Sequence, residues 1–466
     1  MRFVAFLALG LLSTVTALAQ DFPGIRTSNY AGVSSVFANP ANIADSRHRW
    51  DFSLFNISTV VGNNKASFNL KDIGRTLNAD SIKNNVFAEG TGNSNGAISA
   101  VVQGPSVFFN LNKKSALGIT TRARVMSNIV DIDSKLAKQL IDDTENDTGF
   151  PYTITSANKM VVNANAWTEF GLSYAREIYS SGNHYLKGGI SLKYLAGAAN
   201  TSIHIDNLRA TLNEDLIGDD VYLANSSGNI GLNYGGVSTS NFEAKDLLSF
   251  ESTGFGADLG FVYEYRPDVS LAERRDLNKY KFKVSLAVLD IGSIKYQRDL
   301  SRSGGYGINI SGAERFYLSA LADAEIDDYK DTLNKYPQYF TPNASMSQSK
   351  YTVALPSTLQ LNVDYHFHKG LYVNLDTQLA LTNSSKNVNN SQYYTSVALT
   401  PRFESKGVGV FLPMTYNSLT AFTAGAAFRL GPLFIGSGSI LSAAIGSSKQ
   451  ADFIFGLHFG SLQKSN

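Results

Sequence analysis

The side chains that most often do chemistry in proteins are sparse in this sequence and stand apart from one another. Its six histidines fall at positions 48, 184, 204, 366, 368 and 458, and none has the H-E-x-x-H spacing of a zinc protease. His366 and His368 would share one face of a strand beside a turn, where they could bind a metal or serve as ordinary polar residues. No G-x-S-x-G elbow or phosphate-binding loop follows a predicted strand. We therefore expect no catalytic site, no metal site and no cofactor, and a protein that is not an enzyme.

An acidic run at residues 142–149 places oxygen ligands at alternate positions. Its glycine, Gly149, comes one place late for a calcium-binding EF-hand loop, and no glutamate closes the run. We interpret this segment as a solvated loop.

Charged residues recur inside stretches that otherwise alternate between apolar and polar side chains. If these stretches form a barrel, eight of the charges face its inside and are candidate lumen-lining residues. They could pair with one another and with a plug, or they could form a track for a substrate. They are Arg122, Arg124, Lys187, Lys193, Asp258, Glu264, Asp364 and Asp376.

Long strands are needed to position these charges, and residues 357–381 show the pattern most clearly. Apolar residues occupy every second position from 359 to 367, a Lys369-Gly370 turn follows, and the alternation resumes from 371 to 381. Because successive side chains of a strand point to opposite faces, this hairpin has one apolar and one polar face. Each arm has roughly a dozen residues, about what a tilted strand needs to cross a bilayer.

The same alternation recurs along the chain and predicts an all-β fold, a transmembrane antiparallel β-barrel of about 14 strands. The predicted strands lie near 49–61, 98–111, 116–130, 164–179, 184–199, 254–266, 280–292, 352–367, 371–383, 392–404, 407–417, 421–430, 432–441 and 451–462. Long connections at 62–97, 131–163, 200–253 and 293–351 alternate with short turns, which is typical of outer-membrane barrels with extracellular long loops. Helical spacing at 134–141 and 312–336 predicts helices in these loops. A secreted β-sandwich would explain the alternation, but not the one-sided loops.

Composition supports this class and excludes others. The chain of 466 residues has a net charge of +1, 17% charged residues, 39 Gly, 23 Tyr and 28 Phe. A nearly neutral chain lacks the basic surface that nucleic acid requires, so we expect no nucleic-acid partner. It contains no cysteine, which excludes disulfides, thiolate metal sites and a lipid on an N-terminal cysteine.

The first residues predict export. Arg2 precedes an apolar run at 3–12, and Ala17-Leu18-Ala19 forms a cleavage signal, so residues 1–19 are interpreted as a signal peptide. No later segment approaches about twenty uninterrupted apolar residues. The predicted organisation is a signal peptide at 1–19, an N-terminal plug segment at 20–48 and a barrel at 49–466. We expect it in the bacterial cell outer membrane, in contact with lipid.

The plug segment lacks strand alternation and carries a recognisable motif. Asn39 can cap a short helix, and Pro40 fits the first turn of such a helix. With its place between a signal peptide and the first strand, Asn39-Pro40-Ala41 resembles the motif of FadL-type outer-membrane barrels, including the PorV-like proteins. The chain is more similar still to an uncharacterised branch of exported barrels known only as a domain of unknown function. An ordinary turn and cap would also account for the three residues.

The resemblance to FadL-type barrels implies passive transport of small or hydrophobic molecules, with the plug as a hatch and a kinked strand as a lateral exit into the bilayer. Gly104-Pro105, inside a predicted strand, is the candidate lateral gate, since proline cannot donate to the ladder; a harmless bulge would explain it equally well. Pro401 and Pro413 are further candidates. The PorV-like resemblance implies an alternative: a non-transporting scaffold, with the acidic loop 293–351 docking a partner for secretion or surface-lipoprotein attachment.

Overall fold

A computed structural model describes residues 24–67, 69–70, 92–141, 149–156, 158–215, 217, 220–238, 242–271 and 274–463. The predicted signal peptide at 1–19 lies outside these ranges, and so does the acidic run up to residue 148.

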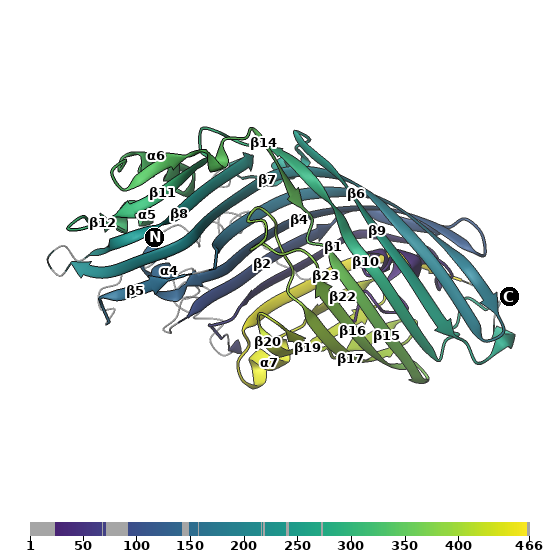
Figure 1. Cartoon of the computed structure of the whole chain (residues 1–466). Helices are drawn as coiled ribbons and strands as arrows, with labels where there is room; N and C mark the ends of the chain where they lie inside the picture. The colour runs from purple at the N-terminus through teal and green to yellow at the C-terminus, as the bar shows by residue number, and fades with distance from the viewer. Residues whose placement is uncertain are drawn as a thin grey trace.

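Within the described residues, fourteen antiparallel strand positions form one closed barrel (Figure 1). Four positions are each built from two short strands. The first half consists of β1 (His48–Asn63), β2 (Asn93–Gln103) with β3 (Ser106–Asn110), β4 (Ser115–Asp133), β6 (Met160–Ser181), β7 (His184–Asp215), β9 (Ser252–Tyr265) and β10 (Phe282–Gln297). The second half consists of β14 (Lys350–Ala354) with β15 (Thr358–His368), β16 (Leu371–Ala380), β17 (Ser396–Glu404), β18 (Val408–Phe411) with β19 (Met414–Asn417), β20 (Ala421–Ala424) with β21 (Ala426–Leu430), β22 (Leu433–Ser437) and β23 (Gln450–Leu462). The circle closes where β1 pairs with β23, from His48–Leu462 to Phe55–Leu457, so the predicted fold class and strand number are confirmed.

The alternating sequence forms strands because it separates an apolar outer face from a polar inner face. On the paired strands β15 and β16, Leu361 and Leu375 are 43% and 41% exposed, whereas Asn362 and Asn374 are 5% and 0% exposed. Inside a closed barrel a small exposed fraction means that the side chain faces the filled interior. Each of the fourteen strand positions is hydrogen-bonded to both of its neighbours, so the backbone of the barrel wall can lie in hydrocarbon.

The height of the apolar outer band matches a membrane. On β9, the aromatic residues Phe255 and Tyr265 bracket the outward apolar positions, and Tyr265 stacks on Phe282 with ring centroids 5.4 Å apart. Ten residues at about 3.3 Å each, tilted by about 40°, rise by about 25 Å, which is the height of the apolar band in outer-membrane barrels. In the described part of the chain, no helix is both long and apolar enough to cross a membrane.

Several predicted strand limits are wrong for local reasons. The predicted strands 371–383 and 392–404 are too long, because residues 381–395 leave the wall and turn into the barrel. The predicted strand 432–441 ends at Ser437, where α7 (Ile440–Ile445) begins shortly afterwards. The predicted strand 98–111 is divided at Gly104-Pro105 into β2 and β3.

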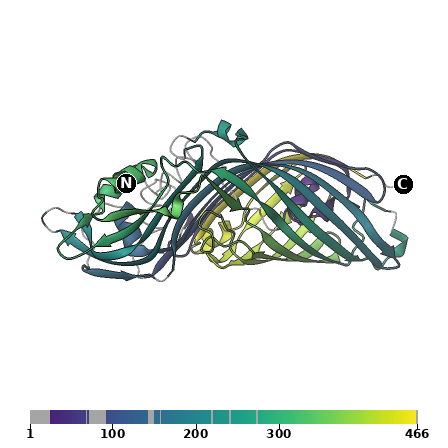
Figure 2. The same ribbon diagram turned by 45° about the horizontal axis from the view of Figure 1, so that its top comes forward.

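Three of the predicted long loops are largely ordered as a sheet that projects from one end of the barrel (Figures 1 and 2). We call it the outer sheet: β5 (Tyr152–Thr155), the distal part of β7, β8 (Asp220–Gly236), β11 (Gly304–Ile310), β12 (Phe316–Tyr317) and β13 (Phe340–Asn343). The helices α4 (Ser134–Ile141), α5 (Ser319–Ala322) and α6 (Tyr329–Asn334) pack on it through Leu136, Leu321 and Leu333. Short 3₁₀ turns lie in the connections: η4 (Ala244–Leu248), η6 (Ile326–Asp328) and η7 (Ala344–Met346) belong to the long loops, and η5 (Val269–Leu271) lies at the opposite, short-turn end of the barrel. The predicted helix at 134–141 is therefore observed, and 312–336 contains two shorter ones.

The N-terminal segment 24–47 lies inside the barrel, near the end that carries the short turns (Figure 2). It forms two 3₁₀ turns, η1 (Gly32–Phe37) and η2 (Pro40–Ile43). All of η1 and all of η2 except Asn42 are buried. In outer-membrane barrels the short turns face the periplasm, which would place this segment at the periplasmic mouth.

Candidate functional site

The Asn39-Pro40-Ala41 motif docks the N-terminal segment on the barrel wall. The Asn39 side chain caps η2 by accepting from Ala41 N–H at 2.9 Å. Its amide nitrogen donates outward to the Phe261 carbonyl at 3.1 Å, the Ser285 hydroxyl at 2.9 Å and the Leu286 carbonyl at 3.1 Å. One side chain therefore both starts the helical turn and fastens it to β9 and β10.

Two glycines make room for this docking. A Cβ atom on Gly260 would lie 2.1 Å from the Asn39 side-chain oxygen, and one on Gly189 would lie 2.4 Å from the Ala41 nitrogen. Only a residue without Cβ lets the plug backbone approach β7 and β9 this closely. The motif therefore docks on a patch of the wall where Gly189 and Gly260 leave room for it. A turn that only reversed the chain would not need such a patch.

The rest of the plug combines apolar and polar contacts with the wall. Its apolar side chains pack against three buried residues of β3, β4 and β6, namely Phe108, Ala116 and Ala175. The Val33 N–H donates to the Asp51 carboxylate at 2.7 Å, and Lys187 donates to the Ala44 carbonyl at 2.7 Å. Buried backbone groups of the plug are thus paired by side chains of the wall, as burial requires.

Next to the plug, six buried charges cross the lumen. We call them the ion layer; they are Arg122, Arg124, Lys193, Glu169, Asp258 and Asp290. Arg122 lies 2.7 Å from Glu169, Arg124 lies 2.8 Å from Asp290, and Lys193 bridges Asp258 at 2.7 Å and Asp290 at 2.6 Å. Three cations face three carboxylates, so the layer is neutral as a whole. Buried charges are tolerated when they are paired in this way.

The ion layer also contacts the plug. The Arg122 guanidinium lies 4.5 Å from the centre of the Phe37 ring, a cation–π contact with the plug. On the other side, Arg124 lies 4.6 Å from the Trp167 ring, whose nitrogen donates to Glu169 at 2.8 Å. The layer therefore connects the plug to the wall strands β4 and β6.

A second inward segment fills the lumen beyond the ion layer. We call residues 381–395, which connect β16 to β17, the inner loop. It meets a row of polar side chains that lie directly opposite one another on four neighbouring strands, β4, β6, β7 and β8. This polar row consists of Asn128, Asn163, Ser202 and Asn233, and its members are buried.

The inner loop is attached to the polar row by hydrogen bonds. Asn128 makes a paired contact with the Gln392 backbone, donating to its carbonyl at 3.0 Å and accepting from its N–H at 2.9 Å. Asn163 donates to the Val388 and Asn390 carbonyls at 3.1 and 2.9 Å. Ser202 and Asn233 both donate to the side-chain oxygen of Asn389, at 2.6 and 2.8 Å.

The inner loop and the ion layer touch each other. Arg124 donates to the Tyr393 hydroxyl at 2.7 Å. The small cavity left between plug, ion layer and inner loop has a volume of about 10 Å³ and is lined by Arg26, Phe37 and Tyr393, among others. That is room for about one water molecule. Plug, ion layer and inner loop therefore follow one another along the lumen, and each contacts the next.

The eight charged residues predicted to line a lumen all lie inside the barrel, but they do not form one track. Arg122, Arg124, Lys193 and Asp258 belong to the ion layer. Lys187 and Glu264 lie 3.8 Å apart at the short-turn end. Asp364 is held bidentately by Arg402 at 2.6 Å for both bonds, and Asp376 accepts from Asn362 at 3.3 Å.

Other residues of the site were missed by the sequence reading. Glu169 and Asp290, the two carboxylates that complete the ion layer, lie in or at the edge of predicted strands. The inner loop and the polar row were also missed. A signal was available, because asparagine is depleted in strands, yet Asn128, Asn163 and Asn233 lie in long observed strands and the inner loop itself is rich in asparagine.

Gly104-Pro105 forms a bulge that is bridged by hydrogen bonds. Gln103 pairs with Arg122 and Val107 with Ile119, so three residues oppose two on β4. Across the bulge, Gly104 N–H donates to the Thr121 carbonyl at 2.9 Å. The Thr121 hydroxyl donates to the Pro105 carbonyl at 3.0 Å, and the Thr121 backbone N–H donates to the Ser106 hydroxyl at 3.1 Å. In this conformation, the wall at the candidate lateral gate is closed.

The two histidines next to the 369–370 turn do not form a metal pair with other ligands. His366 stacks on Tyr372 with ring centroids 4.6 Å apart. Over the described ranges as a whole, no group of three or more His, Asp or Glu side chains is arranged to hold a metal ion.

A closed antiparallel barrel with an apolar outside, a polar inside and a plugged lumen defines the class of outer-membrane β-barrel proteins. Residues 40–438 match the model of a family described as a family of unknown function (DUF5723). The match covers most of the chain, so the protein belongs to this family. The expected branch of barrels defined by a domain of unknown function is thereby confirmed.

Solved structures of similar architecture include two FadL-type barrels. The toluene transporter TbuX of Ralstonia pickettii has 10% identity, with 93% of this chain and 94% of that chain covered and a TM-score of 0.41. A FadL homologue of Pseudomonas aeruginosa has 11% identity, with 91% and 93% covered and a TM-score of 0.41. The translocator domain of the autotransporter NalP of Neisseria meningitidis has 7% identity, with 89% of each chain covered and a TM-score of 0.27. A search of curated proteins finds no match.

Proposed function

We propose that this protein passively transports small or hydrophobic molecules across the bacterial outer membrane, with the plug and the inner loop as gates. The observation that carries the proposal is the way the inner loop is attached. Asn128 and Asn163 together make four hydrogen bonds to its backbone, and such bonds can be exchanged for bonds to water when the loop moves. Apolar packing, which cannot be exchanged for bonds to water in this way, would hold the loop more firmly in a lumen that stays filled.

Two routes fit this proposal. Small polar molecules would pass along the polar inner wall once the inner loop and plug have moved. Hydrophobic molecules would leave sideways into the bilayer, and Gly104-Pro105 is the candidate exit. Opening the wall there would break the three hydrogen bonds across the bulge, at a cost of about 3 kcal/mol at about 1 kcal/mol each.

A reversible cross-link tests the lateral route. A Cβ atom on Gly104 would lie 3.7 Å from that of Thr121, within disulfide range, and the chain has no cysteine of its own. The pair Gly104→Cys/Thr121→Cys should stop uptake of a labelled apolar compound when oxidised and restore it on reduction. The matched control Gly96→Cys/Ile129→Cys joins the same two strands away from the bulge, also with 3.7 Å between the Cβ atoms. If uptake is equal with either pair oxidised, the lateral exit at Gly104-Pro105 is refuted. If uptake is unchanged in a deletion strain, the proposed transport function is refuted as a whole.

The outer sheet favours a second candidate function, that of a scaffold for secretion or surface-lipoprotein attachment. This sheet has its own buried core of residues such as Leu212, Ile308 and Phe316, so it can present a firm surface outside the membrane. Arg302 fixes the neighbouring connection by binding Asp299 and Asp327, each at 2.8 Å. Burial would raise the pKa of Asp299, but hydrogen bonds from Ser301 and Arg302 outweigh it and lower this pKa to about 2.

The acidic side chains on this surface provide the test of the scaffold. Asp323, Glu325, Asp328 and Asp331 are exposed on and around α5, η6 and α6. If they dock a partner, a protein should co-purify in stoichiometric amount and be lost when all four are replaced by their amides. Recovery of the barrel alone from native membranes, before any substitution, would contradict the scaffold.

A further inference from the structure

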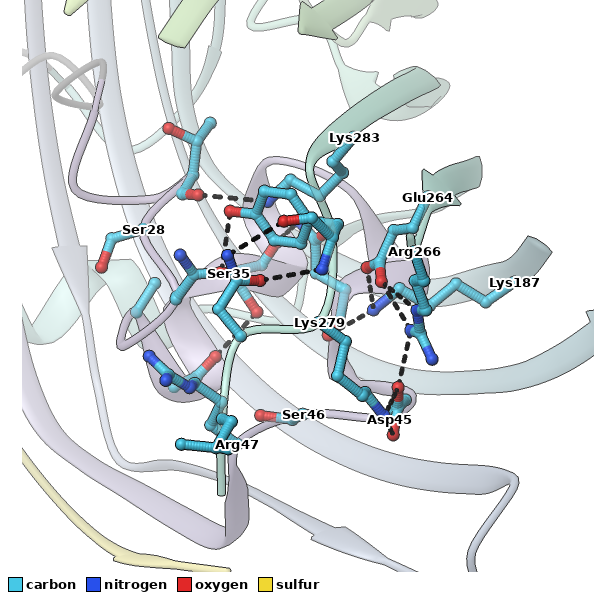
Figure 3. A pocket seen from close by; sticks show the side chains of 18 residues that line it. Ser28, Ser35, Asp45, Ser46, Arg47, Lys187, Glu264, Arg266, Lys279 and Lys283 are labelled. Atoms are coloured by element: carbon cyan, nitrogen blue, oxygen red, sulfur yellow. Dashed lines mark hydrogen bonds and ion pairs between the residues drawn. The ribbon is translucent and has the colours of Figure 1, made fainter. Parts of the chain in front are cut away.

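A cavity of about 70 Å³ lies between the plug and the wall at the short-turn end (Figure 3). By the volume that one water molecule requires, it has room for roughly five waters or for one small polyatomic ion. Three parts of the chain line it: the plug, the ends of β7 and β9, and the connection 266–281 with the start of β10. A ligand there would touch all three.

Positive side chains outnumber negative ones around this cavity. Arg47 comes from the plug, and Lys187, Arg266, Lys279 and Lys283 come from the wall and the connection, whereas Asp45 and Glu264 are the two carboxylates among the lining residues. The four cations from the wall and the connection are each less than a tenth exposed. Burying an excess of one sign is unfavourable unless a counter-ion is present.

The two lining carboxylates are already engaged with several cations each. Asp45 lies 2.7 Å from Arg266 and 2.8 Å from Lys279, and Arg275 approaches it to 3.3 Å. Glu264 lies 2.5 Å from Arg266 and 3.8 Å from Lys187. Figure 3 shows the side chains of Asp45, Glu264, Lys187, Arg266 and Lys279 converging on one side of the cavity. They leave the charge of Lys283, on the other side, without a close partner of its own among them.

Lys283 shares its nearest carboxylate with stronger partners. Its ammonium lies 3.7 Å from Asp364, whose two oxygens accept from Arg402 at 2.6 Å each and from Tyr280 at 2.5 Å. A further lining cation, Arg47, has a buried side-chain Nε without a hydrogen-bond partner. The cavity therefore offers donors and positive charge that the protein itself does not fully use.

We propose that this cavity is a binding site for one small oxyanion group, a phosphate or a carboxylate, that enters from the short-turn side. Such a group neutralises the excess charge and accepts charge-assisted hydrogen bonds from lysine and arginine. Because the lining residues come from both plug and wall, the bound anion fastens the plug in place. The site is separate from the ion layer, and the proposal does not depend on whether the barrel transports anything.

Titration of the full-length protein in detergent with inorganic phosphate, followed by calorimetry, tests this inference. We expect saturable binding of one phosphate per chain, weakened about tenfold or more in Lys283→Gln, since a charge-assisted hydrogen bond is lost. Lys283→Arg should retain binding. The control Lys281→Gln removes the same charge two residues away, where the lysine lies over the Tyr365 ring outside the cavity, and should bind like the native protein. Heat-modifiable migration on a detergent gel reports that each variant is folded.

The source of the anion is distinguished by a second titration with dihexanoyl phosphatidic acid, a short-chain lipid with a phosphate headgroup. Binding of phosphate supports a free anion, and binding of the lipid alone, lost in Lys283→Gln, supports a headgroup in the same site. Binding of neither probe would overturn the proposal. Equal affinities of Lys283→Gln and the native protein would overturn it as well.

Discussion

Replacing Asn128 and Asn163 together with alanine should release the inner loop. The two side chains make four hydrogen bonds to the loop backbone, at 2.9 to 3.1 Å. At about 1 kcal/mol net for each bond, their loss shifts the balance between docked and released loop by about 4 kcal/mol. Since each 1.4 kcal/mol is a factor of ten, the released fraction should rise by about 10³ until it saturates.

Cysteine labelling in whole cells measures this fraction. Thr358 is 2% exposed and lines the small cavity between plug, ion layer and inner loop, so Thr358→Cys reports access past the loop. A membrane-impermeant maleimide added outside should label it at a rate proportional to the released fraction, about 10³-fold faster in the double variant. The control Asn362→Ala removes a buried inward asparagine that bonds to Asn374 and Asp376 rather than to the loop. The inner loop would be refuted as a gate if Thr358→Cys were labelled as fast with Asn128 and Asn163 intact as in the double variant. Equal acceleration by the control Asn362→Ala would refute it as well.

Three other substitutions test separate parts of the structure. Asp290→Asn keeps a residue type that tolerates the backbone φ of +59° but leaves the ion layer with one excess buried cation. It should lower the free energy of unfolding by about 3–5 kcal/mol, and adding Lys193→Met should recover much of this loss. Gly260→Ala should loosen the plug by about 1–3 kcal/mol, detected as faster proteolysis of residues 24–47, whereas Gly407→Ala, with nothing within 4 Å, should not. Leu333→Ala should lower the free energy of unfolding of the outer sheet by about 2–5 kcal/mol. The outer sheet should then become sensitive to protease, while the heat-modifiable migration of the barrel stays unchanged. Unfolding of all parts together in Leu333→Ala would show that the two cores are not separate.

The barrel could be predicted from the sequence because its signal is local and repeated. Alternation along residues 359–367 states directly which side chains face lipid, and the same pattern recurs on most other strands. The alternation of long and short connections then predicts which end of each hairpin is extracellular. The capping role of Asn39 was also readable, since it depends on its neighbour Pro40 and the next two residues.

What the sequence could not give are contacts between distant segments that do not follow a period. Asn39 reaches Phe261, Ser285 and Leu286 only because the plug enters the closed barrel. The inner loop meets Asn128, whose position lies more than 250 residues earlier in the chain. The outer sheet was read as loops, because its strands pair above the membrane and bury their apolar residues under helices rather than in lipid.

The central claim is that passage through this barrel requires the plug to move. A Cβ atom on Gly24 would lie 3.6 Å from that of Thr400, so Gly24→Cys/Thr400→Cys can tie the plug to β17 reversibly. The direct measurement is influx of a labelled small solute into liposomes that contain this variant, before and after reduction, with Gly96→Cys/Ile129→Cys as control. The account predicts low influx while the pair is oxidised and a rise on reduction that the control does not show. Equal influx in both states would contradict it.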